Sequence, residues 1–202
     1  DDRVVLADPA FTRRNTRDNT PCVLSVTMIP GSKISVDVAA KGGGSENKSK
    51  FKMMNPSDNI VDWVLEMLPQ MGAGWCPPGM LGIGIGGTAE HCMALAKKSL
   101  MEPIDMAQLK ARGAQNDIEA LRIEIFDKVN ALGIGAQGLG GLSTILDVKI
   151  LDWPCHAAGK PVAMIPNCAA TRHAHFTLDG SGPSFLEAPK LDEWPKVNWA
   201  PD

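Results

Sequence analysis

Hydrophobic and polar positions along the chain follow two different periods, which predict strands and helices in alternation. Strands are expected at residues 22–30, 33–39, 80–85, 143–151, 163–165 and 172–178. The first two alternate apolar and polar residues on either side of a Pro-Gly-Ser turn, so we expect them to form a β-hairpin. Helices are expected at residues 60–71, 88–100 and 116–132. This interleaving favours an α/β fold with mixed sheets flanked by helices.

The helix expected at residues 116–132 has the clearest pattern. Its apolar stripe consists of Ile118, Leu121, Ile125, Val129 and Leu132. Residues 56–58 and Thr88 are expected to cap the other two helices. Residues 41–50 are too rich in glycine for regular structure, and residues 133–141 form a second glycine loop. The paired prolines after Cys76 exclude both helix and sheet there, so that segment is expected to be a loop.

Composition excludes several classes of protein. The 202 residues are 44% hydrophobic and 21% charged, with a formal net charge of -3. This favours a globular chain and argues against binding to nucleic acid or to an anionic membrane, which both need a basic surplus. No apolar run approaches the roughly 20 residues needed to span a bilayer. The first residues also lack the features of a signal peptide.

The five cysteines, at positions 22, 76, 92, 155 and 168, include no CxxC pair. An odd, scattered set favours reduced thiols in a cytoplasmic protein over a disulfide framework, and leaves some thiols available as metal ligands.

The run from Gly82 to Gly87 satisfies the GxGxxG pattern between an expected strand and an expected helix. A dinucleotide-binding module is therefore the alternative reading, with Glu102 and Asp105 near the distance of a ribose contact. The pattern does not lie in the first strand–helix turn, however, and no further strand–helix units follow. A strand packed closely against another backbone explains alternating glycines equally well.

Cys76 lies in the segment GAGWCPPG and Cys168 in IPNCAATRH, and both contexts favour projecting loops. An iron–sulfur cluster needs thiolates that converge from loops. The two cysteines are 92 positions apart (168 − 76), so the local spacing of ferredoxins is absent and inert buried thiols are the alternative.

Several motifs occur together and in order. They are Asn15-Thr16 with Asn19 and Pro21, Lys41-Gly42-Gly43-Gly44-Ser45 with Asn47-Lys48, Cys76-Pro77-Pro78, Gly86-Gly87-Thr88-Ala89-Glu90, Gly133-Ile134-Gly135-Ala136-Gln137, His156 and Cys168. In this combination the chain resembles the class I fumarases, oxygen-sensitive iron–sulfur hydro-lyases related to the tartrate dehydratases. The resemblance runs to about Phe176 and implies the cluster-bearing domain of that type.

The resemblance implies a 4Fe–4S cluster held by three cysteines, of which Cys76 and Cys168 match two. The third belongs to an upstream CQDTG-like motif that this chain lacks. Cys22, Cys92 and Cys155 match no ligand and are expected to be ordinary core thiols. One iron without a protein thiolate would bind the substrate as a Lewis acid.

Three further residues match substrate contacts of the family. Gly44 matches a glycine whose main-chain N–H meets the substrate, and His156 matches a substrate-contacting, catalytic histidine 12 positions before the cluster cysteine (168 − 156). Arg3 is matched to a substrate-binding arginine. A structural histidine, a flexible turn and a terminal arginine are the ordinary alternatives. No role is assigned to Lys48, Thr88 or Gln137.

The implied reaction is reversible hydration of fumarate to malate, with tartrate or mesaconate as open alternatives for the C4-dicarboxylate. Residues 1–202 are expected to be part of an N-terminal, alpha-type domain, with the C-terminal, beta-type domain absent from the chain. The fragment alone is therefore expected to be inactive. The family implies a homodimer. Outside hydro-lyases and dinucleotide binding, an interaction fragment whose glycine loops only aid packing is the remaining reading.

Overall fold

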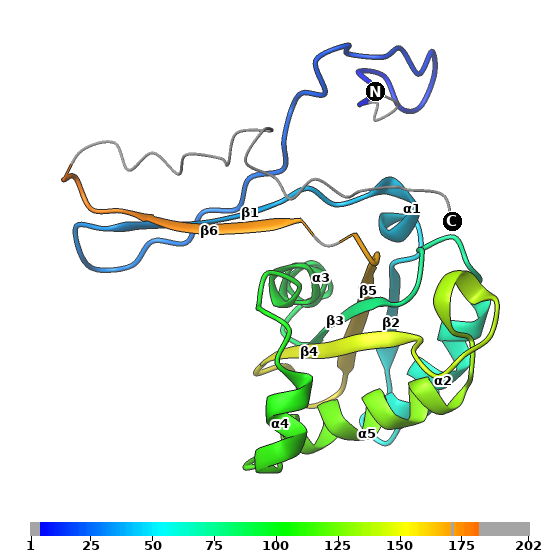
Figure 1. Ribbon diagram of the computed structural model, residues 1–202. Helices are drawn as coiled ribbons and strands as arrows, with labels where there is room; N and C mark the ends of the chain where they lie inside the picture. The colour runs from blue at the N-terminus through cyan, green and yellow to red at the C-terminus, as the bar shows by residue number, and fades with distance from the viewer. Residues whose placement is uncertain (1–4, 171, 182–202) are drawn as a thin grey trace, which may run out of the picture. The chain divides into compact units, whose positions relative to one another are not determined.

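The computed structural model describes residues 5–170 and 172–181, and the chain divides into two units (Figure 1). The first unit comprises Asp1–Leu24 and Asp37–Ala174, and the second comprises Ser25–Val36 and His175–Asp202. Each unit is described by itself. Arg3 lies outside the described residues.

A four-stranded mixed sheet forms the centre of the first unit. Its strands follow the order β2 (Lys50–Met54), β5 (Lys160–Asn167), β3 (Gly79–Gly86) and β4 (Ile145–Trp153). β3 runs parallel to β4, and β5 runs antiparallel to β2 and to β3. This confirms the mixed sheet predicted from the sequence, and β4 forms one of its edges.

Helices cover both faces of this sheet. They are α1 (Gly43–Glu46), α2 (Ile60–Gln70), α3 (Ala89–Ser99), α4 (Met106–Arg112) and α5 (Asp117–Ala131). Leu81 and Ile83 belong to the core that includes α2 and α5, whereas Met80 packs in the core formed with α3. Because neighbouring residues of a strand point to opposite faces, α3 covers one face, and α2, α4 and α5 cover the opposite one (Figure 1). The short helix α1 lies beside α3, because Glu46 pairs with Lys97.

The glycines of β3 allow α3 to approach the sheet closely. A Cβ atom built on Gly82 would lie 2.4 Å from the carbonyl oxygen of Ala96, and one on Gly84 would lie 2.1 Å from that of Cys92. The alternation of Gly and Ile therefore separates a glycine face against α3 from an isoleucine face against the larger core. These glycines are buried inside a strand, so the structure favours the packing reading over a phosphate-binding turn.

Buried charges join the edge strand β4 to the helices beside it. The Asp147 side chain, which is 0% exposed, accepts hydrogen bonds from the main-chain N–H groups of Asp105 and Met106 at 2.7 and 3.1 Å. Lys149 Nζ lies 2.6 Å from Asp105 Oδ1, and Arg122 bonds to both aspartates. These contacts fix the start of α4.

Side chains also satisfy the outer main chain of β4. Arg122 Nε donates to the carbonyl oxygen of Val148 at 2.6 Å, and the Val148 N–H donates to Asp147 Oδ1 at 2.6 Å. Asn130 of α5 accepts from the N–H groups of Thr144 and Ile145 at 2.7 and 3.0 Å. These outer main-chain groups of β4 therefore bond to side chains of α5 and to the side chain of Asp147.

The expected hairpin is wrong in its first half. Residues 22–30 form no strand, and the side chain of Val23 is 99% exposed. β1 (Ile34–Ala39) confirms the second half, but it pairs with β6 (His173–Leu178) in a separate two-stranded sheet. Alternation alone gives no strand where no neighbour supplies the hydrogen bonds. Cys22 is exposed as a result, so its assignment as a core thiol is also wrong.

Most other expected elements are confirmed with shifted ends, including all three helices. Asn59 caps α2 in place of residues 56–58, and Asn116 caps α5. Thr88 occupies the cap position of α3 without a side-chain capping bond. The expectation of no regular structure at residues 41–50 is wrong, because α1 forms there, and the sequence pattern missed both β2 and α4.

Within the described part of the chain, no helix is both long enough and apolar enough to cross a bilayer.

Replacing Gly84 by Ala should lower the free energy of unfolding by about 3 kcal/mol, because the new methyl group meets the main chain of α3. Gly43→Ala is the control, since a Cβ there meets nothing within 4 Å. Urea unfolding of the two variants would measure the difference. Equal stabilities would contradict the packing role of Gly84.

Candidate active site

The two predicted ligand cysteines come together at one end of the sheet. Cys76 lies three residues before β3, and Cys168 directly follows β5. Because these strands are antiparallel, with Met80 opposite Asn167, the start of β3 lies beside the end of β5. The Ala169 N–H donates to the Cys76 carbonyl oxygen at 3.0 Å. Cysteines 92 positions apart in the sequence (168 − 76) are thus adjacent through their main chains.

The two loops can meet this closely because Gly79, at the start of β3, has no side chain. A Cβ atom built on Gly79 would lie 1.9 Å from the carbonyl oxygen of Asn167 and 2.9 Å from the ring of Trp75. Cys76 is exposed and Cys168 is partly exposed, so solvent reaches this end of the sheet at both positions. The prediction that both cysteines lie on loops is confirmed.

The glycine-rich segment at residues 41–50 packs against the loop that carries Cys76. A Cβ atom on Gly44 would lie 2.6 Å from the carbonyl oxygen of Gly74, whereas Gly42 and Gly43 have open space around them. The close approach that demands glycine at position 44 is therefore made to a neighbouring loop. It places the Gly44 main chain beside the cysteine loops.

Two lysines lie at the same end, and sequence reasoning missed both. Lys41 Nζ donates to Ser45 Oγ at 2.8 Å and lies 3.1 Å from Glu46 Oε2, and its charge interacts with Cys168. A Cβ atom on Gly74 would lie 2.9 Å from Lys48 Cε and 3.5 Å from Lys48 Nζ. The available signal was their position on either side of α1, within a motif already set apart.

Burial and ion pairing have opposite effects on the pKa of Lys41, and likewise on the pKa of Glu46. Burial lowers the pKa of Lys41, and the neighbouring Glu46 only partly offsets that effect. Burial acts to raise the pKa of Glu46, but its bonds to Lys97 and Lys41 outweigh this and hold the pKa below its ordinary value. Glu46 is therefore an anion at neutral pH, and it pairs with the ammonium groups of Lys97 and of Lys41, the latter beside Cys168.

A three-thiolate cluster fits these residues in part. Within residues 5–170 and 172–181, no group of three His, Cys, Asp or Glu side chains is placed to hold a metal ion. The described residues supply two thiols on loops whose main chains meet, which is the chemistry expected for two of the three ligands.

His156 lies at the other end of the sheet. It follows β4 and precedes β5, whereas Cys168 comes after β5. β5 has 8 residues, so the two ends are roughly 25 Å apart at about 3.3 Å per residue. The structure does not bring His156 together with the cysteine loops in one chain, and its catalytic and substrate-binding roles stay predictions.

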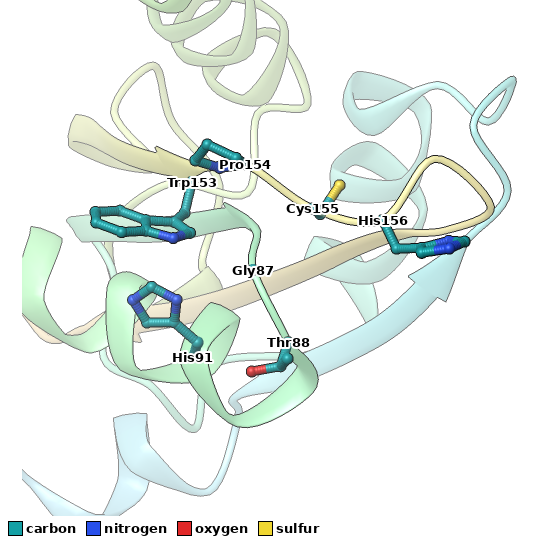
Figure 2. A pocket seen from close by; sticks show the side chains of 7 residues that line it. All are labelled: Gly87, Thr88, His91, Trp153, Pro154, Cys155 and His156. Atoms are coloured by element: carbon teal, nitrogen blue, oxygen red, sulfur yellow. The ribbon is translucent and has the colours of Figure 1, made fainter.

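His156 lines an open pocket of about 360 Å³ (Figure 2). The lining residues are Gly87, Thr88, His91, Trp153, Pro154, Cys155 and His156. The His91 and Trp153 rings meet edge to face, with centroids 5.1 Å apart. The His156 ring lies apart from this pair, and its Nδ1 accepts a hydrogen bond from the Ala158 N–H at 3.1 Å.

Of the three remaining cysteines, Cys92 is buried, whereas Cys22 and Cys155 are exposed. Cys92 is buried between α3 and the sheet, as expected for a core thiol. Cys155 is exposed, because β4 has ended and its loop lies at the surface, so its assignment as a core thiol is wrong.

The family model for fumarate hydratase (Fumerase) matches residues 3–177. The chain belongs to the fumarate hydratase family. In this fumarate hydratase family chain, the matched range includes both cysteine loops, the glycine-rich segment and the pocket.

Curated relatives of this fumarate hydratase family chain have a common name. The chain is 44% identical over 145 residues to the "Putative L(+)-tartrate dehydratase subunit alpha" of Methanocaldococcus jannaschii, covering 70% of this chain and 49% of the relative. It is 28% identical over 185 residues to the L(+)-tartrate dehydratase subunit alpha of Escherichia coli K12, covering 87% and 59%. The chain thus spans about half the length of the relatives it matches.

Cys92 should resist alkylation until the protein unfolds. Burial raises its pKa to about 11, and its side chain is 0% exposed, so its reactive thiolate is scarce at pH 8. Iodoacetamide treatment of the folded apoprotein, followed by peptide mass spectrometry, should label exposed Cys155 and leave Cys92 free. Labelling of Cys92 and Cys155 at one rate under native conditions would contradict the described core.

Proposed function

We propose that this chain is the cluster-bearing part of a hydro-lyase of the class I fumarase type. The observation that carries the proposal is the meeting of Cys76 and Cys168, which the Ala169–Cys76 hydrogen bond of 3.0 Å ties together. Two adjacent loops that each carry an accessible thiol suit a cluster far better than a dinucleotide. Membership of the fumarate hydratase family supports the same chemistry.

In this proposal, Cys76 and Cys168 supply two thiolates to a 4Fe–4S cluster. When bound, such a cluster supplies a Lewis-acidic iron that polarises the substrate's hydroxyl group. The chain's own contribution is to bind and orient a dianionic substrate beside the thiolates. The ammonium groups of Lys41 and Lys48 attract carboxylates, and the proposal assigns one of these carboxylates to the Gly44 main-chain N–H.

We infer that the substrate is a C4-dicarboxylate. The family name supports fumarate, and the names of the relatives support L(+)-tartrate. Either substrate presents two carboxylates and exchanges one molecule of water across a carbon–carbon bond, so both lysines serve the same purpose in each case.

A second polypeptide segment completes the proposed enzyme. The relatives are named as alpha subunits, and this chain covers 49% and 59% of their lengths. We propose that an upstream segment supplies the third cysteine ligand, and that a C-terminal domain or partner subunit supplies the base and the remaining substrate cations. The chain alone is then inactive. Assembly as a homodimer and a cytoplasmic location belong to the same proposal.

Loss of either ligand thiol should abolish cluster binding. Cys76→Ala and Cys168→Ala variants of the intact enzyme, reconstituted anaerobically, should lose most of their iron and acid-labile sulfide. Cys155→Ala should retain both, because Cys155 lies at the opposite end of the sheet. Wild-type iron content in the Cys76 or Cys168 variant would overturn the assignment.

Lys48→Met should raise the KM for the dicarboxylate about 10-fold, because a charge-assisted hydrogen bond is lost at the substrate. Steady-state assays with fumarate and with L(+)-tartrate on the intact enzyme would measure this and identify the preferred substrate. Lys98→Met, on the exposed surface of α3, is the control and should leave KM unchanged. Activity on neither substrate would contradict the proposed reaction class.

A further inference from the structure

The Cys76 loop has a main-chain conformation that its surroundings must maintain. Cys76 has a φ of 58°, in the left-handed region that residues other than glycine seldom occupy. Such a conformation persists only where neighbouring contacts determine it. The contacts around Cys76 therefore identify the groups that control the direction of its thiol.

Three segments hold this loop through main-chain groups. The Cys76 N–H donates to the Ala73 carbonyl oxygen at 2.9 Å, and the Cys76 carbonyl oxygen accepts from the Ala169 N–H at 3.0 Å. The next carbonyl, that of Pro77, accepts two hydrogen bonds from Gln137. One comes from the main-chain N–H at 2.8 Å and the other from the side-chain Nε2 at 3.1 Å.

Two donors from one residue restrain the Pro77 carbonyl more than a single bond would. A carbonyl oxygen has two lone pairs, and Gln137 occupies both. The Pro77–Pro78 peptide group, one residue beyond Cys76, is therefore fixed in orientation as well as in position. Pro77 has no main-chain N–H, so its carbonyl oxygen is the main-chain group through which residue 77 can form a hydrogen bond.

Gln137 itself rests on a rigid support. It has a φ of 54°, and the glycine loop around it bonds to itself, with Gly140 N–H donating to the Ile134 carbonyl oxygen at 2.8 Å. A Cβ atom on Gly138 would lie 3.1 Å from Ala73 Cβ, so this loop packs directly against the segment that precedes Cys76. The glycine loop at residues 133–141 thus supports the cysteine loop from one side.

We propose that Gln137 is a positioning residue for the Cys76 thiolate: its paired hydrogen bonds to the Pro77 carbonyl hold that thiolate in the orientation that binds the cluster. This inference rests on the proposed function, because it presupposes that Cys76 is a ligand. Gln137 does not touch the substrate in this role. It acts only through the Pro77–Pro78 peptide group, which fixes the end of the loop just after Cys76.

The test compares Gln137→Met with Gln70→Met in the intact protein, purified and reconstituted anaerobically. Methionine keeps the length and neutrality of glutamine. It removes the side-chain donor Nε2 and leaves the main-chain N–H bond to Pro77 in place. Gln70 is a matched control, since its Nε2 also donates to a main-chain carbonyl, that of Glu66 at 3.1 Å in α2. Gln137→Met should release iron to a chelator about 10-fold faster than wild type, as found for residues that orient metal ligands.

A spectroscopic readout separates positioning from general stability. The reduced cluster of Gln137→Met should give an altered EPR spectrum, while that of Gln70→Met should match wild type. If Gln137→Met does not fold, Gln137→Glu replaces it, because glutamate has the shape of glutamine without the Nε2 donor. Gln137→Glu should then show the same faster iron release and altered EPR spectrum.

The outcomes distinguish this inference from the proposed function. If wild type holds a cluster and Gln137→Met shows wild-type iron release and EPR, the positioning role is overturned while the function stands. Equal acceleration in the Gln70 variant would also overturn it, since the effect would then be general. A wild-type protein that holds no cluster overturns both.

Discussion

The antiparallel register between β3 and β5 decides where Cys76, Cys168 and His156 lie. Met80 stands opposite Asn167, so the residues just before β3 and just after β5 share one end of the sheet. The same register sends the loop between β4 and β5 to the other end. A shift of the register would separate Cys76 from Cys168, although both would remain on loops.

Glycine serves packing at both ends of this arrangement. Gly82 and Gly84 let α3 approach β3, and Gly79 lets the two cysteine loops meet. In each case a methyl group would lie within about 2.5 Å of a main-chain oxygen, so these positions are steric requirements and not flexible hinges. Part of the glycine content of the chain therefore reflects closely stacked backbones.

The sequence predicts local structure here better than spatial relations. The stripe through Ile125 and Val129 predicted α5, because packing and periodicity agree along one helix. The segment at residues 22–30 has an equally clear alternation but no described strand beside it, and a strand needs that partner. α4 was missed because its start is fixed by Asp147, 41 positions beyond Met106 in the sequence (147 − 106).

The candidate site shows the same division. Motif resemblance selected Cys76 and Cys168, and the register explains why they meet. The nearness of Lys41 and Lys48 to them depends on how α1 packs on the loop before Cys76, which no spacing in the sequence reveals. Conversely, the resemblance implied that His156 and Cys168 serve one site, but in this chain the intervening strand β5 carries them to opposite ends of the sheet.

The bonded edge of β4 has a consequence for how this protein meets other chains. An open edge strand is a template on which a foreign strand can add, which leads to aggregation. Here Val148 gives its N–H to Asp147 and its carbonyl to Arg122, and Asn130 takes the N–H groups that begin the strand. An incoming strand would have to displace a charged, buried network before it could pair. Arg122 and Asn130 of α5 thus oppose the addition of a foreign strand at this part of β4.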